Sequence, residues 1–209
     1  MRLRPGGVHC RRCNLLLGGG AVSYPDKRTL LVSGRFLSDA FCTINHLAVP
    51  AVREVDAKDW KFDACAYYRK DVTTICVTRC AAIGVAGMAW SYPGYTVDRT
   101  PYGVLQHELG HHADYVKSTR KGPYYGDFSV VMRTDVDEKP ITSYCPNDAE
   151  WFAEMFRLFV TNPDLLAKTR PGTHAAMREH FTPVFNDSWR DRLTAAPERT
   201  IAAIERKLA

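Results

Sequence analysis

The sequence predicts an α+β fold, and three of its segments support that prediction. Residues 66–77 contain Ala-Tyr-Tyr, a polar turn and then a run rich in β-branched residues, which is typical of a β-hairpin. A helix is expected over residues 100–116, because Thr100 suits the N-cap and Pro101 suits the first helical position. A second, strongly apolar helix is expected over residues 148–160. Strands followed by helices favour the α+β class.

The remaining segments are expected to be shorter or less regular. Residues 1–35 look like a basic extension, separate from a main domain over residues 36–209. A helix is expected over residues 36–55, interrupted or ended by Pro50. The other expected elements are strands at residues 15–17, 29–33 and 128–132, an irregular stretch at 84–94, a helix opening near 165–166 and an amphipathic helix at 197–208.

The expected helix over residues 100–116 contains the pattern H-E-x-x-H, from His107 to His111. Two histidines four residues apart project from the same face of a helix, so these two could bind one Zn²⁺. Glu108 lies beside the first histidine and could act as general base toward a water on that metal. His112 points about 100° away from His111 and is not expected to join the same ion. Because zinc needs more than two ligands, a third one is required.

Glu150 and Glu154 are the candidates for completing the site. They lie four residues apart on the apolar second helix, and buried carboxylates are costly unless a cation compensates them. Glu150 is therefore expected to be the third zinc ligand, and Glu154 to accept a hydrogen bond from a ligating histidine. The alternative is a capping box between Asn147 and Glu150, which leaves Glu154 unexplained. A metzincin site is excluded, because Asp114 and Lys117 stand where that class needs Gly and His.

Both helical segments resemble a known family. The runs HELGHHAD, from His107, and TSYCPNDAEWFAEMFRL, from Thr142, resemble the gluzincin metallopeptidases related to the catalytic domain of anthrax lethal factor. The resemblance covers roughly residues 60–165 and implies a zincin-like metallopeptidase fold. In such a fold a small mixed sheet with an edge strand lies beside the H-E-x-x-H helix, and a C-terminal helical part provides the glutamate ligand. The strand over residues 72–77 would be the edge strand that pairs with substrate.

Three protein ligands leave a fourth position open, which is the catalytic rather than the structural arrangement of zinc. The resemblance accordingly implies a zinc-dependent endopeptidase of gluzincin type that acts on a protein or peptide substrate. Its expected ligands are His107, His111 and Glu150. Glu108 is the expected base, which takes a proton from zinc-bound water and passes it to the leaving amine.

The resemblance also implies roles for residues around the metal. Tyr144 is expected to donate a hydrogen bond to the developing oxyanion, with Tyr124 and Tyr125 as the alternatives. Asp114 is expected to contact a ligand or a helix end.

The cysteines suggest a second metal site. Seven is an odd number, which argues against a complete disulfide framework. Cys10 and Cys13 have the spacing of one zinc knuckle, and Cys76 and Cys80 could complete a structural zinc site if the fold brings the two pairs together. Free thiols in a loop and a strand are at least as consistent with this pattern.

The positive charge lies at the N-terminus. Residues 1–36 contain seven of the 28 Lys and Arg and one acidic residue, whereas the rest of the chain has 21 basic and 22 acidic residues. This segment could contact nucleic acid, or it could be an ordinary solvated face. The alternative to an endopeptidase is therefore a zinc-stabilised nucleic-acid-binding or interaction module without protease activity.

The hydropathy of the chain argues against a membrane location. It contains no run of eighteen apolar residues. The apolar stretch at residues 15–17 is too short for an export signal. We therefore expect a cytoplasmic protein.

Overall fold

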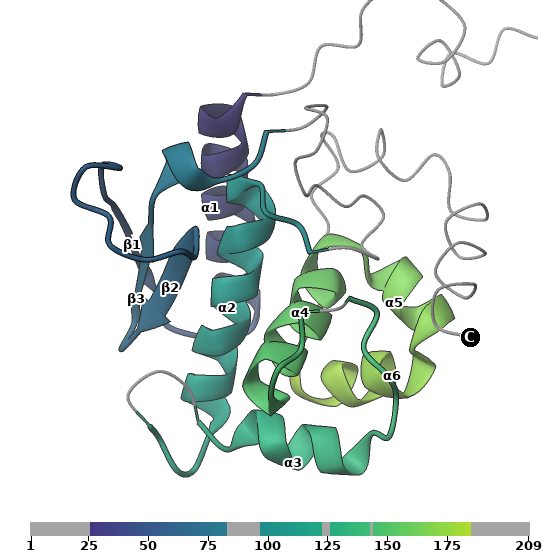
Figure 1. The fold of residues 1–209 in the computed structure, drawn as a ribbon. Helices are drawn as coiled ribbons and strands as arrows, with labels where there is room; N and C mark the ends of the chain where they lie inside the picture. The colour runs from purple at the N-terminus through teal and green to yellow at the C-terminus, as the bar shows by residue number, and fades with distance from the viewer. Residues whose placement is uncertain (1–25, 83–96, 123–125, 143, 185–209) are drawn as a thin grey trace, which may run out of the picture.

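The computed structural model describes residues 26–82, 97–122, 126–142 and 144–184. These residues form helices and a three-stranded sheet, so the α+β class is confirmed. The elements are, in order, α1 (Lys27–Ile44), β1 (Ala51–Glu54), β2 (Ala66–Arg69), β3 (Val72–Ile75), the 3₁₀ helix η1 (Val77–Arg79), α2 (Pro101–Lys117), α3 (Phe128–Asp135), α4 (Asp148–Thr161), α5 (Pro163–Thr169) and α6 (Pro171–His180). Helix α2 lies between the sheet on one side and α3–α6 on the other (Figure 1).

The sheet has the order β1-β3-β2, with β1 parallel and β2 antiparallel to β3. The predicted hairpin is confirmed, and its turn places Lys70 and Asp71 at positive φ. The sheet is mixed, as expected, but the prediction that residues 72–77 form an edge strand is wrong. The helix expected over residues 36–55 ends at Ile44 as part of α1, and Pro50 comes directly before β1. Strand β1 instead pairs with β3, so β1 and β2 form the edges of the described sheet.

Helix α1 begins well before residue 36, so the strand predicted at residues 29–33 is wrong. Asp26 caps the helix by accepting a hydrogen bond from the backbone N–H of Thr29 at 2.7 Å. Helix α1 crosses the boundary expected between residues 35 and 36, and its first half packs into the core. The buried positions of α1 recur at helical spacing, and a window as short as a strand does not reveal this spacing. They are Leu30, Leu31, Gly34, Leu37, Ser38, Phe41 and Cys42.

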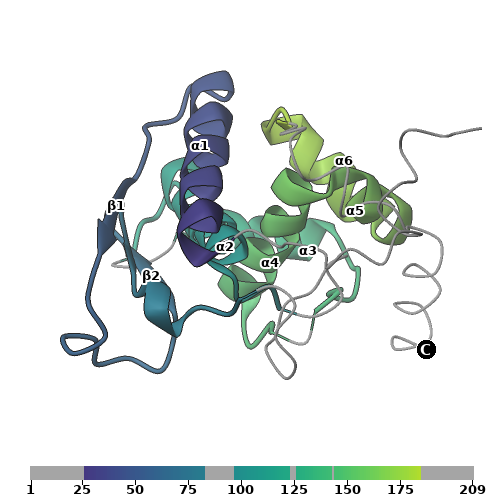
Figure 2. The same ribbon diagram turned by 90° about the horizontal axis from the view of Figure 1, so that it is seen from above.

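Helix α2 is the centre of the fold, and its predicted start is confirmed. Thr100 Oγ1 accepts a hydrogen bond from the backbone N–H of Gly103 at 3.2 Å, and Pro101 takes the first helical position. The helix packs against α1 and α4, as the view from above shows (Figure 2). At Gly110 an added Cβ would lie 2.7 Å from the Cα of Ala153 in α4. The H-E-x-x-H helix and the helix with the expected glutamate ligand therefore approach closely at this glycine.

Gly110→Ala is expected to lower the free energy of unfolding by about 1–2 kcal/mol, since the overpacking outweighs the gain in helix propensity. Chemical denaturation measures the change. The control is Gly34→Ala on α1, whose Cβ would first meet the flexible Cδ1 of Leu105 at 3.0 Å and should cost less. Equal stability of Gly110→Ala and the wild type would show that α2 and α4 separate without cost.

The strand predicted at residues 128–132 is wrong, because this segment belongs to helix α3. Its run of Val and Phe has a high β propensity, which tertiary contacts override. The carboxylate of Asp114, near the end of α2, accepts hydrogen bonds from the backbone N–H groups of Gly126 and Ser129 at 2.9 and 2.7 Å. The bond to Ser129 satisfies a donor in the first turn of α3 that has no partner within the helix, and the bond to Gly126 holds the chain just before it.

The second apolar helix is confirmed as α4, and the helix expected near residues 165–166 is confirmed as α5. Asn162 ends α4 and also caps α5 through its side chain. The following helix, α6, was not predicted. The elements expected at residues 15–17, 84–94 and 197–208 lie outside the described residues. None of the described helices combines the length and the apolar character needed to span a membrane.

Candidate metal centre

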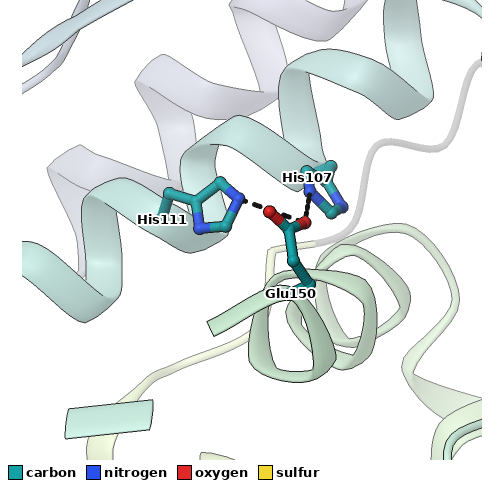
Figure 3. Close-up of side chains that lie close together, drawn as sticks. All are labelled: His107, His111 and Glu150. Atoms are coloured by element: carbon teal, nitrogen blue, oxygen red, sulfur yellow. Dashed lines mark hydrogen bonds and ion pairs between the residues drawn. The ribbon is translucent and has the colours of Figure 1, made fainter. Parts of the chain in front are cut away.

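Three side chains from two helices converge between α2 and α4 (Figure 3). His107 and His111 project from one face of α2, and Glu150 reaches them from the first turn of α4. Glu150 Oε2 lies 2.9 Å from His107 Nε2 and 3.5 Å from His111 Nε2. The ligand atoms all lie within 4.8 Å of one another, and no other group of three His, Cys, Asp or Glu side chains among the described residues is this compact. The group could therefore hold a metal ion.

The start of α4 bears on the two interpretations of Glu150. Asn147 caps the helix by accepting a hydrogen bond from the backbone N–H of Glu150 at 3.0 Å. The carboxylate of Glu150, in contrast, lies against His107 and His111. The backbone of Glu150 thus takes part in the cap, while its side chain takes part in the candidate metal centre.

Glu154 lies one turn further along α4 and is fully buried. Its Oε1 lies 2.8 Å from Nδ1 of His107, the ring nitrogen that faces away from Glu150. Its Oε2 accepts a hydrogen bond from Thr142 Oγ1 at 2.8 Å, and Arg157 donates to both carboxylate oxygens at 3.1 Å. Glu154 therefore contacts a candidate ligand where the sequence placed it. Its contacts with Thr142 and Arg157 were not predicted.

The three groups perturb one another's pKa values. Burial disfavours a charged His107, but hydrogen bonds to Glu150 and Glu154 outweigh burial and raise the pKa of His107 to about 10. Burial also disfavours a charged Glu150, yet the hydrogen bonds from His107 and His111 hold the pKa of Glu150 below its ordinary value. In the metal-free protein an imidazolium thus lies between two carboxylates. A metal ion must displace the proton on Nε2, because a ligating nitrogen has to be deprotonated.

The metal-free protein is expected to lose stability as the pH rises from about 6.5 to about 10. Protonated His107 has a higher pKa in the folded protein than its ordinary value of 6.5. Its contribution to stability is therefore complete below pH 6.5 and disappears as the pH rises through about 10. The lowered pKa of Glu150 acts in the opposite direction: its contribution is complete above about 4.5 and is lost as the pH falls below that value. Urea denaturation across this range, in the presence of a chelator, measures the effect.

Metal affinity, in contrast to stability, is expected to increase as the pH rises. Because metal binding releases the proton of His107, the affinity should rise about tenfold per pH unit. The rise ends at the pH at which His107 is already deprotonated in the metal-free protein. Metal-saturated protein is the control, because a ligating His107 no longer titrates. A metal-free protein whose stability is flat between pH 6.5 and 10 would contradict the ion pair.

Glu108 lies beside these ligands with a buried side chain. Burial raises the pKa of its carboxyl group, while the nearby His111 and His107 oppose that rise. The same carboxyl group accepts a backbone hydrogen bond from Tyr68 on β2. A raised pKa brings a carboxylate closer to the range in which a general base works near neutral pH.

His112 faces the sheet and lies outside the ligand group, as predicted. Its Nε2 lies 2.7 Å from the carbonyl oxygen of Ala48, and its Nδ1 lies 3.1 Å from the hydroxyl of Tyr68. Burial lowers the pKa of His112, so the ring is neutral near pH 7. Nε2 then donates to the carbonyl, and Nδ1 is an acceptor that shares the hydroxyl hydrogen of Tyr68 with Asp71 Oδ1, 3.2 Å from that hydroxyl. The contact between His112 and Tyr68 joins α2 to β2 beside Glu108, and no sequence pattern signals it.

Tyr144 lies at the rim of the cluster, with its ring centroid 5.8 Å from that of His107. The side chain is 44% exposed. Partial burial and the charges of Glu150 and Glu108 raise its pKa, so the phenol stays protonated and able to donate. Its oxyanion role stays a prediction. The alternatives, Tyr124 and Tyr125, lie outside the described residues.

Asp114 contacts a helix end, which is one of the two roles expected of it. Its carboxylate accepts the hydrogen bonds at the start of α3 described above, and one from Ser118 Oγ at 3.4 Å. It is not part of the ligand group.

Only two of the four cysteines predicted for a structural zinc site, Cys76 and Cys80, lie within the described residues, since Cys10 and Cys13 lie outside them. Cys76 and Cys80 are buried free thiols, and Cys80 Sγ donates to the carbonyl oxygen of Cys76 at 3.6 Å. Within the described part of the chain these thiols do not form a three-residue metal group.

The described part of the basic segment makes internal contacts. Arg28 and Arg35 both pair with Glu54 on β1. Lys27 Nζ donates to the carbonyl oxygen of Thr78 at 3.0 Å. The other basic residues of this segment lie outside the described residues, namely Arg2, Arg4, Arg11 and Arg12.

The geometry thus brings together the three predicted ligands, His107, His111 and Glu150, with Glu108 beside them and Glu154 behind. It adds contacts from β2 and from the chain before α4 that the sequence did not indicate. Comparison with known proteins gives no further assignment, since no protein family model, no curated protein and no solved structure matches the chain.

Proposed function

We propose that this protein is a zinc-dependent endopeptidase of gluzincin type with a zincin-like fold. The observation that supports this most is the convergence of His107, His111 and Glu150 beside the buried carboxyl group of Glu108. A metal that only stabilises a fold needs no carboxylate base beside it, whereas hydrolysis uses one.

The donor set fits zinc. Two imidazoles and one carboxylate are a known ligand set of catalytic zinc, in which the fourth position stays open. Ca²⁺ and Mg²⁺ prefer oxygen ligands alone, so two histidines disfavour them. A zinc ion bound here would supply Lewis-acid chemistry, polarising a peptide carbonyl and lowering the pKa of a water molecule.

The residues of this chain have separate tasks in the proposed reaction. Glu154 holds Nδ1 of His107, which turns Nε2 of that ring toward Glu150 and the ligand group. Glu108 accepts the proton of the attacking water and delivers it to the leaving amine. Tyr144 donates a hydrogen bond to the oxygen on which negative charge develops.

The proposed substrate is a protein or peptide in an extended conformation. Strand β2 is an edge of the described sheet, and its backbone at Tyr68 contacts the carboxyl group of Glu108. An extended peptide that adds to this edge would place its backbone beside the proposed base.

The proposal is tested with the full chain in metal-free form. It is titrated with zinc and incubated with a peptide library, and cleavage is read by mass spectrometry. We expect one equivalent of zinc at the candidate centre, cleavage that appears with zinc and loss of cleavage on chelation. Zinc binding without cleavage, together with tight and salt-sensitive DNA binding, would instead support a zinc-stabilised binding module.

A further inference from the structure

A set of buried charged groups lies behind His107, on the side away from Glu150. Glu154 is fully buried, and Arg157 is 2% exposed. Asp98, in the segment before α2, is a third buried charged group at 8% exposure, and its Oδ1 accepts a hydrogen bond from the backbone N–H of Thr100. Charges this deep require compensation, since an uncompensated buried charge strongly destabilises a fold.

Arg157 makes a two-point contact with Glu154. Nε lies 3.1 Å from Oε1, and Nη2 lies 3.1 Å from Oε2. Two parallel N–H···O bonds fix the plane of a carboxylate as well as its position. The same Oε1 lies 2.8 Å from His107 Nδ1, so the orientation of the guanidinium is passed to the imidazole through one shared oxygen.

Arg157 provides the positive charge that compensates the buried Glu154 carboxylate. Glu154 contacts both His107 and Arg157. A metal-ligating imidazole is neutral, whereas an arginine keeps its charge. Asp98 lies close enough for its charge and that of Arg157 to stabilise each other.

We propose that Arg157 is a positioning residue of the metal centre. It holds the Glu154 carboxylate in the plane that keeps the proton of His107 on Nδ1 and the lone pair of Nε2 directed at the metal. The inference rests on the proposed metal site. It adds a residue that does not contact the metal and that carries no recognisable ligand motif.

The test is a double-mutant cycle read by zinc affinity, using competition with a chromophoric chelator. Arg157→Met keeps the volume of the side chain but removes its charge and its two-point contact with Glu154. It is expected to weaken zinc binding by about 10-fold, within the 10–100-fold range typical of residues that hold a metal ligand in place. Glu154→Gln is expected to weaken binding similarly. Because Arg157 acts through Glu154, the double variant should bind zinc as Glu154→Gln does, without a further loss.

Two further variants separate positioning from general destabilisation. Arg157→Lys keeps the charge and should recover part of the affinity lost in Arg157→Met. Arg133→Met removes a partly buried arginine that packs over Trp151, and it should lower stability without changing zinc affinity. The visible spectrum of the Co²⁺-loaded protein is a second readout, which should change in Arg157→Met and stay unchanged in Arg133→Met.

The outcomes distinguish this inference from the proposed function. A wild-type chain that binds no zinc would overturn the metal centre and this inference with it. Normal zinc binding by the wild type, with equal affinity in Arg157→Met, would overturn the inference alone. If Arg157→Met does not fold, the double variant decides, because removing both charges of a buried pair is tolerated. Affinity several-fold below that of Glu154→Gln would then show that Arg157 does not act through Glu154.

Discussion

Glu108→Gln is expected to lower kcat for peptide hydrolysis by about 10²–10⁴-fold while the protein still binds one equivalent of zinc. The amide has the size of the carboxylate but cannot accept the proton of the attacking water. Glu108 is not part of the ligand group, so the change leaves the two histidines and Glu150 in place. Burial raises the pKa of the carboxyl group, which suits it to proton transfer.

Two measurements check this result together. Zinc content is determined by atomic absorption on the purified variant, and hydrolysis is followed with a peptide found in the library screen. Glu179→Gln is the matched control, because Glu179 is exposed on α6, and it should leave both quantities unchanged. Full activity of Glu108→Gln would contradict the proposed mechanism, whereas loss of zinc would show that Glu108 supports the ligands.

Local sequence signals predicted the elements whose ends are fixed by nearby residues. Thr100 and Pro101 start α2, Asn147 caps α4, and the turn at Lys70 and Asp71 closes the hairpin. In each of these cases the cap or turn lies within the element or next to it. Two of the segments that were predicted wrongly depend on partners far along the chain.

Strand β1 and helix α3 illustrate such partners. β1 exists because residues 51–54 pair with β3, although the same residues fell within the helix expected over residues 36–55. The start of α3 is held by Asp114, which is 15 residues before Ser129. A pattern read over one short window contains neither contact, so propensity decided the prediction and tertiary structure decided the fold.

The candidate site divides in the same way. His107 and His111 follow from helical spacing, and Glu150 and Glu154 follow from the cost of burying two carboxylates. Arg157, Thr142 and Tyr68 did not follow, although Arg157 lies one turn after Glu154. An arginine on a buried helix has many uses, and only the geometry shows that its two nitrogens meet the two oxygens of Glu154.

Glu150→Ala is expected to weaken zinc binding by more than about 100-fold, because it removes a ligand rather than a residue that orients one. Peptide hydrolysis should disappear with the metal. The competing interpretation treats Glu150 as part of a helix cap, and it predicts a loss of stability with zinc retained. The structure allows the two to be separated, since the cap uses the backbone of Glu150 and the candidate metal centre uses its side chain.

Asn147→Ala is the matched variant for that separation. It removes the side-chain acceptor of the cap and should lower the free energy of unfolding by about 0.5–2 kcal/mol, with zinc affinity unchanged. Glu150→Ala keeps the capping bond, because its backbone N–H still donates to Asn147, and it should lose zinc. Zinc affinity and denaturation are measured on both variants. If Glu150→Ala retained zinc while Asn147→Ala lost it, the ligand set would be wrong and Glu150 would act only at the helix end.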